Sequence, residues 1–464
     1  MAYSINNRNR ETNGYGWRAY QAGIQLRKKR RQRNRTLLKL LFLLLAVTLG
    51  LSGLFMSING FALYRPPAAD PLHAAAENKE NPQGSLHDKQ RVHSLLSPGR
   101  LINLQEAGFA LETNGQNLQV DTSLDPDLQR YMLKKMDRVN SRYIGIVAAE
   151  PASGKIILLS GFNKENPDQD PCLDNQFPAA SIFKIVSAAA AVEQCGLTSD
   201  SKMRFNGYAH TLYKRQLKDV NNRYTNHITL RDSFAKSINP VFGKIGTLYL
   251  NKSQLEQYAR QFGFNQAIDF EVEFPASHLS IEDASYNWAE IASGFNNTTT
   301  LSPLHGVLLA AAVVNNGEIV EPTVIDRITD ASGQTLYRGV PKPLKQAIEP
   351  STSAVLNDMM QATVRYGTAR KIFRGSRKDR ILSRLSIGGK TGSIFNRKHD
   401  LRFDWFVGFA EEIKGEKKLA VSVVVAHEEY IGIRAGQYAR MIIRKHFLDY
   451  FSKRDEQNPS HPAG

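Results

Sequence analysis

The spacing of apolar residues predicts a globular region that opens with strands and continues with helices. Two apolar runs, at 143–150 and 155–160, flank the turn-forming sequence "PASG" and predict a β-hairpin. Apolar residues at helical spacing then predict that residues 181–265 are mostly helical. A further helix is predicted at 301–317, where Asn-Asn-Gly marks its end.

The C-terminal third returns to strand-like apolar runs. Three strands are predicted at 385–395, 404–412 and 418–427, the last two as a hairpin, followed by a closing helix at 436–451. Strands at both ends of the region, with helices between them, predict one sheet assembled from distant parts of the chain. The fold class is therefore predicted to be α+β, with layers of sheet and helix.

The N-terminal part has a different pattern. The sequence "LLFLLLAVTLGLSGLFMSI", Leu40–Ile58, is 19 residues long and carries no charge, which predicts a transmembrane signal anchor over residues 36–62. Residues 1–35 hold ten Lys or Arg and one acid, so this basic tail is expected in the cytoplasm. The remainder is then expected on the periplasmic or extracellular side of the cytoplasmic membrane, tethered by a single span.

Composition and charge complete the domain prediction. The 464 residues carry a net charge of +16, but the adjacent apolar run favours a membrane flank over nucleic-acid binding for the basic tail. Residues 63–100 are rich in Pro, Ala and polar residues and predict a flexible linker. The folded domain is predicted at 101–452, with a disordered tail at 453–464.

A serine and a lysine three positions apart open the predicted helix at 181. Ser181 and Lys184 share one helix face, where a hydroxyl and an amine could act as nucleophile and base. Pro178 suits the first helical turn and Gly196 the helix end. The spacing alone carries little weight, because two other pairs repeat it: Ser199/Lys202 and Ser233/Lys236.

Two further motifs single out Ser181. Ser237 and Asn239 lie in "FAKSINPVF", and Lys390-Thr391-Gly392 follows two glycines in a predicted strand. The order S-x-x-K, S-x-N, K-T-G is that of penicillin-binding proteins and serine β-lactamases. With "LQVDTSLDPDLQRYM" and "DWFVGFA" in addition, residues 115–450 resemble the transpeptidase domain of a penicillin-binding protein. The resemblance implies a central antiparallel sheet flanked by helices, with a mostly helical subdomain.

The resemblance also implies a role for each motif residue. Ser181 would be acylated by D-Ala-D-Ala stem peptides of peptidoglycan and by β-lactam antibiotics, with Lys184 as its base. Ser237 would relay the proton to the leaving amine, and Asn239 would bind substrate and steady Lys184. The substrate carboxylate would be held by Lys390 and Thr391. The segment that would bind substrate runs through Gly392 to Ser393, and the backbone N–H groups of Ser181 and Ser393 would form the oxyanion hole. No metal or cofactor is expected.

Several alternatives stay open at this point. A D,D-carboxypeptidase uses the same acyl-enzyme, a class D-like β-lactamase or β-lactam sensor shares most of the motifs, and a wall-binding scaffold would not use them. Ser393 stands where many transpeptidases have Thr. The stretch between the apolar run and the first hairpin is expected to leave no room for a glycosyltransferase domain or a large pedestal. A cell-wall synthesis complex is a possible partner.

Two features outside the motifs complete the expectations. Residues 365–387 hold eight Lys or Arg and one Asp, and form either a solvated insertion or a patch that attracts anionic polymer or lipid head groups. Cys172 and Cys195 are the two cysteines of the chain, and both fall on the oxidising side of the predicted anchor. A disulfide between them is expected, because the intervening chain can run back beside the helix that Ser181 begins.

Overall fold

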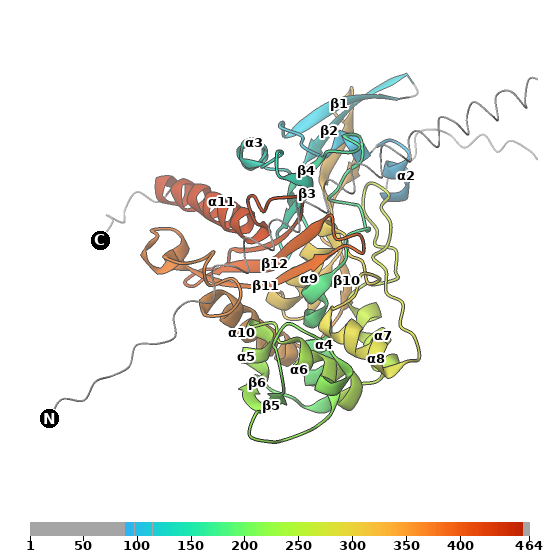
Figure 1. Ribbon diagram of the computed structural model, residues 1–464. Helices are drawn as coiled ribbons and strands as arrows, with labels where there is room; N and C mark the ends of the chain where they lie inside the picture. The colour runs from blue at the N-terminus through green and yellow to red at the C-terminus, as the bar shows by residue number, and fades with distance from the viewer. Residues whose placement is uncertain (1–88, 97, 114, 458–464) are drawn as a thin grey trace, which may run out of the picture. The chain divides into compact units, whose positions relative to one another are not determined.

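The computed structural model describes residues 89–96, 98–113 and 115–457 (Figure 1). The predicted basic tail and membrane anchor, and nearly all of the linker, lie outside these ranges. Within them, no helix combines the length and apolar character that crossing a bilayer requires.

A five-stranded antiparallel sheet forms the centre of the described part. Its strands, in spatial order, are β11 (Leu385–Phe395), β12 (Arg402–Glu412), β13 (Lys418–His427), β3 (Ser141–Ala149) and β4 (Ile156–Asn163). Both predicted hairpins and the predicted 385–395 strand are confirmed. Because β11 lies at the edge of the sheet, one side of its backbone is left open beyond its pairing with β12.

Successive side chains along these strands point to opposite faces of the sheet, and each face packs against its own apolar core. On β12, Trp405 and Val407 point into the core that also holds α4 (Lys184–Cys195) and α9 (Pro303–Val314). Phe406 lies between them and points into the opposite core, which α11 (Ala435–Gln457) covers. Figure 1 shows α11 and α9 on opposite sides of the sheet. Successive side chains of a strand point to opposite faces, so continuous apolar runs of this kind supply both cores.

The helical subdomain is more broken than its apolar periodicity predicts. Its elements after α4 are the short strands β5 (Lys202–Phe205) and β6 (Asn226–Thr229), then α5 (Leu230–Ala235), α6 (Asn239–Lys244), α7 (Lys252–Gln261) and α8 (Ser285–Ser293). Residues 181–265 were predicted to be mostly helical, but the chain breaks at Ser237, whose φ is +55°. Pro240 gives the physical reason, because a proline inside a helix removes one hydrogen bond and clashes with the preceding turn.

The described region also contains smaller sheets outside the five-stranded sheet. Its four-stranded sheet has the order β1 (Gly108–Thr113), β2 (Gln116–Thr122), β8 (Ile325–Asp330) and β9 (Thr335–Arg338). A two-stranded sheet pairs β10 (Pro343–Gln346) with β7 (Glu318–Val320). The remaining long helices are α3 (Pro126–Lys135) and α10 (Pro350–Arg365).

Both predicted domain boundaries need correction. The short helix α2 (Lys89–His93) lies inside the predicted linker, yet Val92 is fully buried in the core that also holds α4 and α9. Lys89 donates to the Pro322 carbonyl at 2.8 Å and forms an ion pair with Glu321. At the other end, α11 continues to Gln457, beyond the predicted end at 452. The contacts of residues 89–100 could not be predicted from composition, because they involve single residues and the segment has no repeating apolar face.

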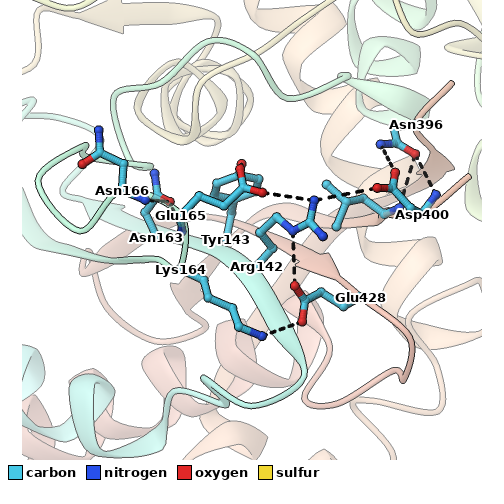
Figure 2. Close-up of polar contacts among 10 residues, drawn as sticks. Arg142, Tyr143, Asn163, Lys164, Glu165, Asn166, Asn396, Asp400 and Glu428 are labelled. Atoms are coloured by element: carbon cyan, nitrogen blue, oxygen red, sulfur yellow. Dashed lines mark hydrogen bonds and ion pairs between the residues drawn. The ribbon is translucent and has the colours of Figure 1, made fainter. Parts of the chain in front are cut away.

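A network of ion pairs and hydrogen bonds links the turn between β11 and β12 to Arg142 on β3 (Figure 2). The Arg142 guanidinium on β3 lies 3.2 Å from carboxylate oxygens of both Glu165 and Glu428, and 3.8 Å from one of Asp400. Asn396 donates to Asp400 at 2.7 Å across the turn itself. The arginine thus links the loop after β13 and the segment after β4 to the turn that follows the K-T-G strand.

The expected disulfide is wrong, because both cysteines are free thiols. The Cys172 thiol is fully buried and hydrogen-bonds to the carbonyls of Ile146 and Ser160, beneath β3 and β4. The Cys195 thiol, at the end of α4, hydrogen-bonds to the Tyr249 carbonyl instead. Chain length would have allowed the bond, but the segment after Cys172 packs under the sheet and does not run back along α4.

Candidate active site

Ser181 lies in a tight turn that leads directly into α4. The turn Ala180–Phe183 is a 3-10 helix, and the α-helical part begins only at Lys184. Pro178 therefore lies outside the helix, where its carbonyl accepts a hydrogen bond from Trp405 at 2.9 Å. Gly196 ends α4 in the left-handed conformation, as predicted.

The Lys184 amine is the centre of the polar contacts. Its Nζ lies 2.8 Å from Ser181 Oγ, 2.8 Å from Asn239 Oδ1 and 2.5 Å from the Ser293 carbonyl oxygen. A neutral amine has two N–H donors and one lone pair. The amide and carbonyl oxygens can accept both N–H groups, which leaves the lone pair for the Ser181 hydroxyl proton. This arrangement is that of a base beside a nucleophile.

A second lysine extends the network from the other side. Ser237 Oγ lies 3.0 Å from Ser181 Oγ, and Lys390 Nζ lies 3.0 Å from Ser237 Oγ. The contacts form a continuous path in which Lys390 donates to Ser237 and Ser237 to Ser181, and with Lys184 in its neutral form Ser181 can donate to the Lys184 amine. Lys390 also donates to the Thr391 carbonyl at 2.9 Å, which fixes its amine against β11.

Burial sets the charge of both lysines. Lys184 and Lys390 are fully buried, and in the described ranges neither has an ion pair to a carboxylate. Burial lowers the pKa of Lys184 well below its ordinary value, and the charge of Lys390 lowers it further. Burial also lowers the pKa of Lys390, to about 7. Burial and the neighbouring charge of Lys390 therefore both favour the neutral form of the Lys184 amine.

Each amine faces an aromatic ring as well as polar groups. Lys184 Nζ lies 5.5 Å from the Phe242 ring centroid, and Lys390 Nζ lies 5.5 Å from that of Phe234. The two rings come from α5 and α6, on either side of the break at Ser237. The break thus places Ser237 between the two lysines and one phenylalanine ring beside each lysine amine.

Three of the predicted substrate-binding residues, Thr391, Gly392 and Ser393, line an open cavity of about 480 Å³ that Ser181 and Ser237 also line. The Thr391 hydroxyl lies 2.5 Å from the hydroxyl of Thr368, and Ser393 Oγ accepts a hydrogen bond from Arg402 Nε at 2.9 Å. A side chain at Gly392 would come within 3.3 Å of Ala180 and Trp405, so glycine allows β11 to approach the Ser181 turn closely. Six of the eight predicted site residues therefore line one cavity, and the two fully buried lysines, Lys184 and Lys390, contact its serines by hydrogen bonds.

Three groups that contact the site residues were not predicted from the sequence. The Ser293 carbonyl is a backbone group, for which residue identity gives no signal. Thr368 lies in the basic segment and contacts the site only because that segment packs beside β11. Arg402 stands at the start of a strand, where charged residues are common. The sequence signal that could have pointed to Arg402 was Ser393, its hydrogen-bond partner on the paired strand.

The match to a protein-family model agrees with this geometry. The model described as "Penicillin binding protein transpeptidase domain" matches residues 144–447. The chain belongs to this family. The match covers the whole five-stranded sheet except for the first three residues of β3, and all three motifs.

Individual relatives cover the chain to different extents. The peptidoglycan D,D-transpeptidase PbpA of Mycolicibacterium smegmatis is 23% identical over 367 residues, which are 71% of each chain. Penicillin-binding protein 1A of Neisseria meningitidis is 33% identical over 202 residues, which are 42% of this chain and 21% of the relative. The chain therefore spans only a small part of the length of the 1A relatives.

Solved structures share the fold. Penicillin-binding protein A of M. tuberculosis, as an imipenem acyl-enzyme complex, has a TM-score of 0.57 at 20% identity and covers 70% of this chain and 78% of its own. The D,D-transpeptidase domain of a peptidoglycan glycosyltransferase from Eggerthella lenta has a TM-score of 0.58 at 20% identity, with 80% and 92% covered. Both likenesses support the α+β architecture of the family.

A pair of glycines tests how tightly the Ser181 turn is held. Gly294 ends α8 with φ +63°, and a Cβ there would lie 1.9 Å from the Ala180 carbonyl oxygen. We expect Gly294→Ala to displace the turn before Ser181 and to slow covalent labelling by a fluorescent penicillin by about 100-fold, because small displacements of reacting groups cost rates of this order. The labelling rate measures the effect.

Gly196→Ala is the matched control. Gly196 ends α4 with φ +61°, and a Cβ there would have no neighbour within 4 Å. It carries the same left-handed strain, about 1 kcal/mol of unfolding free energy, without touching the turn. Its labelling rate should stay within twofold of the parent. Equal rates for both variants would show that the contact with Ala180 does not hold the nucleophile.

Proposed function

We propose that the chain is a peptidoglycan D,D-transpeptidase that works through an acyl-enzyme on Ser181. The observation that carries the proposal is the continuous path from Lys390 through Ser237 and Ser181 to the buried Lys184. The name of the PbpA relative and the β-lactam acyl-enzymes among the structural neighbours support the same reaction. β-Lactams would act as inhibitors by acylating the same serine.

The contacts support a role for each group in the acylation step. Ser181 Oγ attacks the carbonyl carbon of the D-Ala-D-Ala bond while its proton moves to the Lys184 lone pair. The backbone N–H groups of Ser181 and Ser393 receive the developing oxyanion. As the C–N bond breaks, the proton passes to the leaving D-alanine amine by way of Ser237. An acceptor amine then attacks the ester, and its proton returns to Ser181 by the reverse path.

Substrate binding is assigned to β11. Lys390 and Thr391 hold the terminal carboxylate, and the open edge of the strand pairs with the backbone of the stem peptide. Asn239 keeps its amide turned toward Lys184 because its Nδ2 donates to the His210 carbonyl at 3.2 Å. Arg402 positions the Ser393 hydroxyl at the other end of the cavity.

The cellular arrangement is part of the proposal. The uncharged run Leu40–Ile58 and the basic residues before it support a single-pass anchor in the cytoplasmic membrane, with the catalytic domain outside the cytoplasm. The substrate would then be the stem peptides of the wall beside that membrane. A role in a cell-wall synthesis complex and in cell shape would follow from this location.

The products of a stem pentapeptide test the proposed reaction. We expect the full chain to release D-alanine and to form cross-linked dimers, and the Ser181→Ala variant to form neither, because no other hydroxyl replaces the nucleophile. Ser199→Ala, at the same spacing from a lysine, is the control and should keep full activity. Trimmed peptide without dimers would show a carboxypeptidase, and dimers from the Ser181→Ala variant would refute the site.

The pH dependence tests the charge states. The second-order rate of acylation reports the free enzyme and should be bell-shaped. It falls on the acid side because protonated Lys184 cannot accept the serine proton. It falls on the alkaline side, near pH 7, because Lys390, with a pKa of about 7, loses the charge that binds the carboxylate. An unperturbed lysine base would instead make the rate rise toward about pH 10.

Lys184→Arg isolates the base within that test. A guanidinium stays charged throughout this range, so acylation should fall by about 100-fold or more at every pH. Lys236→Arg is the matched control, because Lys236 is exposed and lies three residues after Ser233. An active Lys184→Arg enzyme would exclude the neutral amine as the base.

A further inference from the structure

A second large cavity lies outside the active site. Its volume is about 800 Å³, and it is enclosed by the end of α10, the segment 366–384, the first residues of β11 and the turn after β12. None of the predicted site residues lines it. The segment 366–384 makes up most of the basic stretch that the sequence left as either a solvated insertion or an anion-binding patch.

The rim of this cavity is strongly cationic. Exposed side chains of Arg370, Arg374, Arg377 and Lys378 stand around it, and no ion pair within the described ranges neutralises them. The one acid of the segment, Asp379, is already paired with Arg444 on α11 at 2.9 Å. The positive charge on the rim is therefore available to a ligand.

The floor of the same cavity is apolar. Phe373, Leu382 and Ile387 are buried beneath it, and Ile413, at the edge, is 61% exposed. Ile413 and the three buried side chains line the same cavity, so its apolar floor reaches the surface beside the cationic rim. A solvated insertion accounts for the charges but not for the apolar floor.

Rim and floor together select an amphiphilic anion. Guanidinium groups bind phosphate oxygens through paired hydrogen bonds, and the apolar floor suits a hydrocarbon chain. We propose that this cavity binds an anionic phospholipid, with the phosphate on Arg374, Arg377 and Lys378 and one acyl chain against the floor. A soluble phosphate would leave the floor unused, and a zwitterionic head group would bring its own cation against the rim.

Photo-cross-linking to the full chain tests the assignment. The protein, in neutral detergent, is irradiated with a phosphatidylglycerol that carries a photoactivatable acyl chain, and the modified peptides are mapped by mass spectrometry. We expect cross-links in residues 361–387. Unlabelled phosphatidylglycerol should abolish them, whereas phosphatidylcholine and inorganic phosphate at equal concentration should not.

Two triple variants with the same loss of charge isolate the rim. Arg374→Gln/Arg377→Gln/Lys378→Gln should lower cross-linking at the cavity by tenfold or more, given the contribution of each basic side chain to binding anionic lipid. The control is Lys134→Gln/Lys218→Gln/Arg338→Gln, which changes three exposed cations elsewhere and should keep cross-linking within twofold. Unchanged penicillin labelling of the first variant shows that it is folded.

Ile413→Ser tests the floor separately and should weaken cross-linking while leaving the rim charge intact. The proposal is overturned if the two triple variants cross-link equally, or if phosphatidylcholine competes as well as phosphatidylglycerol. Full competition by inorganic phosphate would assign a simple anion site. Competition by a soluble anionic polymer but not by phosphatidylglycerol would assign a wall polymer. Either result contradicts a lipid site.

Discussion

Two buried amines that have no carboxylate partner among the residues that the structure describes are the constraint on which this site depends. A charged lysine is costly to bury, so its pKa falls until the neutral form is favoured. Lys184 and Lys390 are both fully buried, and their polar partners are hydroxyl, amide and carbonyl oxygens. Because their charges also repel each other, the state with both amines charged is disfavoured, and the proposed mechanism gives Lys184 the role of the base. A carboxylate beside either lysine would stabilise its charge and remove this division of roles.

The fold keeps this arrangement in place by bringing three distant segments to one point. The turn before α4 supplies Ser181, the break between α5 and α6 supplies Ser237, and the edge strand β11 supplies Lys390. Gly294 and Gly392 let neighbouring backbone approach the Ser181 turn without a side chain between them. At the far end of the sheet, the contacts of Arg142 fasten the turn that follows β11 (Figure 2). The catalytic distances thus depend on packing that extends through both cores.

Much of this was predictable from the sequence, and the exceptions have physical reasons. Apolar runs on either side of turn-forming links predicted both hairpins of the sheet, and motif order selected Ser181 among three similar Ser/Lys pairs. The break at Ser237 was not foreseen, because the apolar periodicity continues through it and only Pro240 signals it. The Ser293 carbonyl and Thr368 contribute through backbone position and tertiary packing, which residue types do not encode. The disulfide prediction failed because reach along the chain says nothing about which surface a loop packs against.

The charge of Lys184 in the resting enzyme is the central claim, and it can be observed directly. Protein labelled with ¹⁵N on lysine side chains can be titrated by NMR, with the Lys184→Arg variant to assign the signal. The account predicts that the Lys184 amine is neutral at pH 7 and titrates well below the ordinary lysine range, while exposed lysines such as Lys236 titrate near about 10.4. A Lys184 signal that titrates together with the exposed lysines would contradict it.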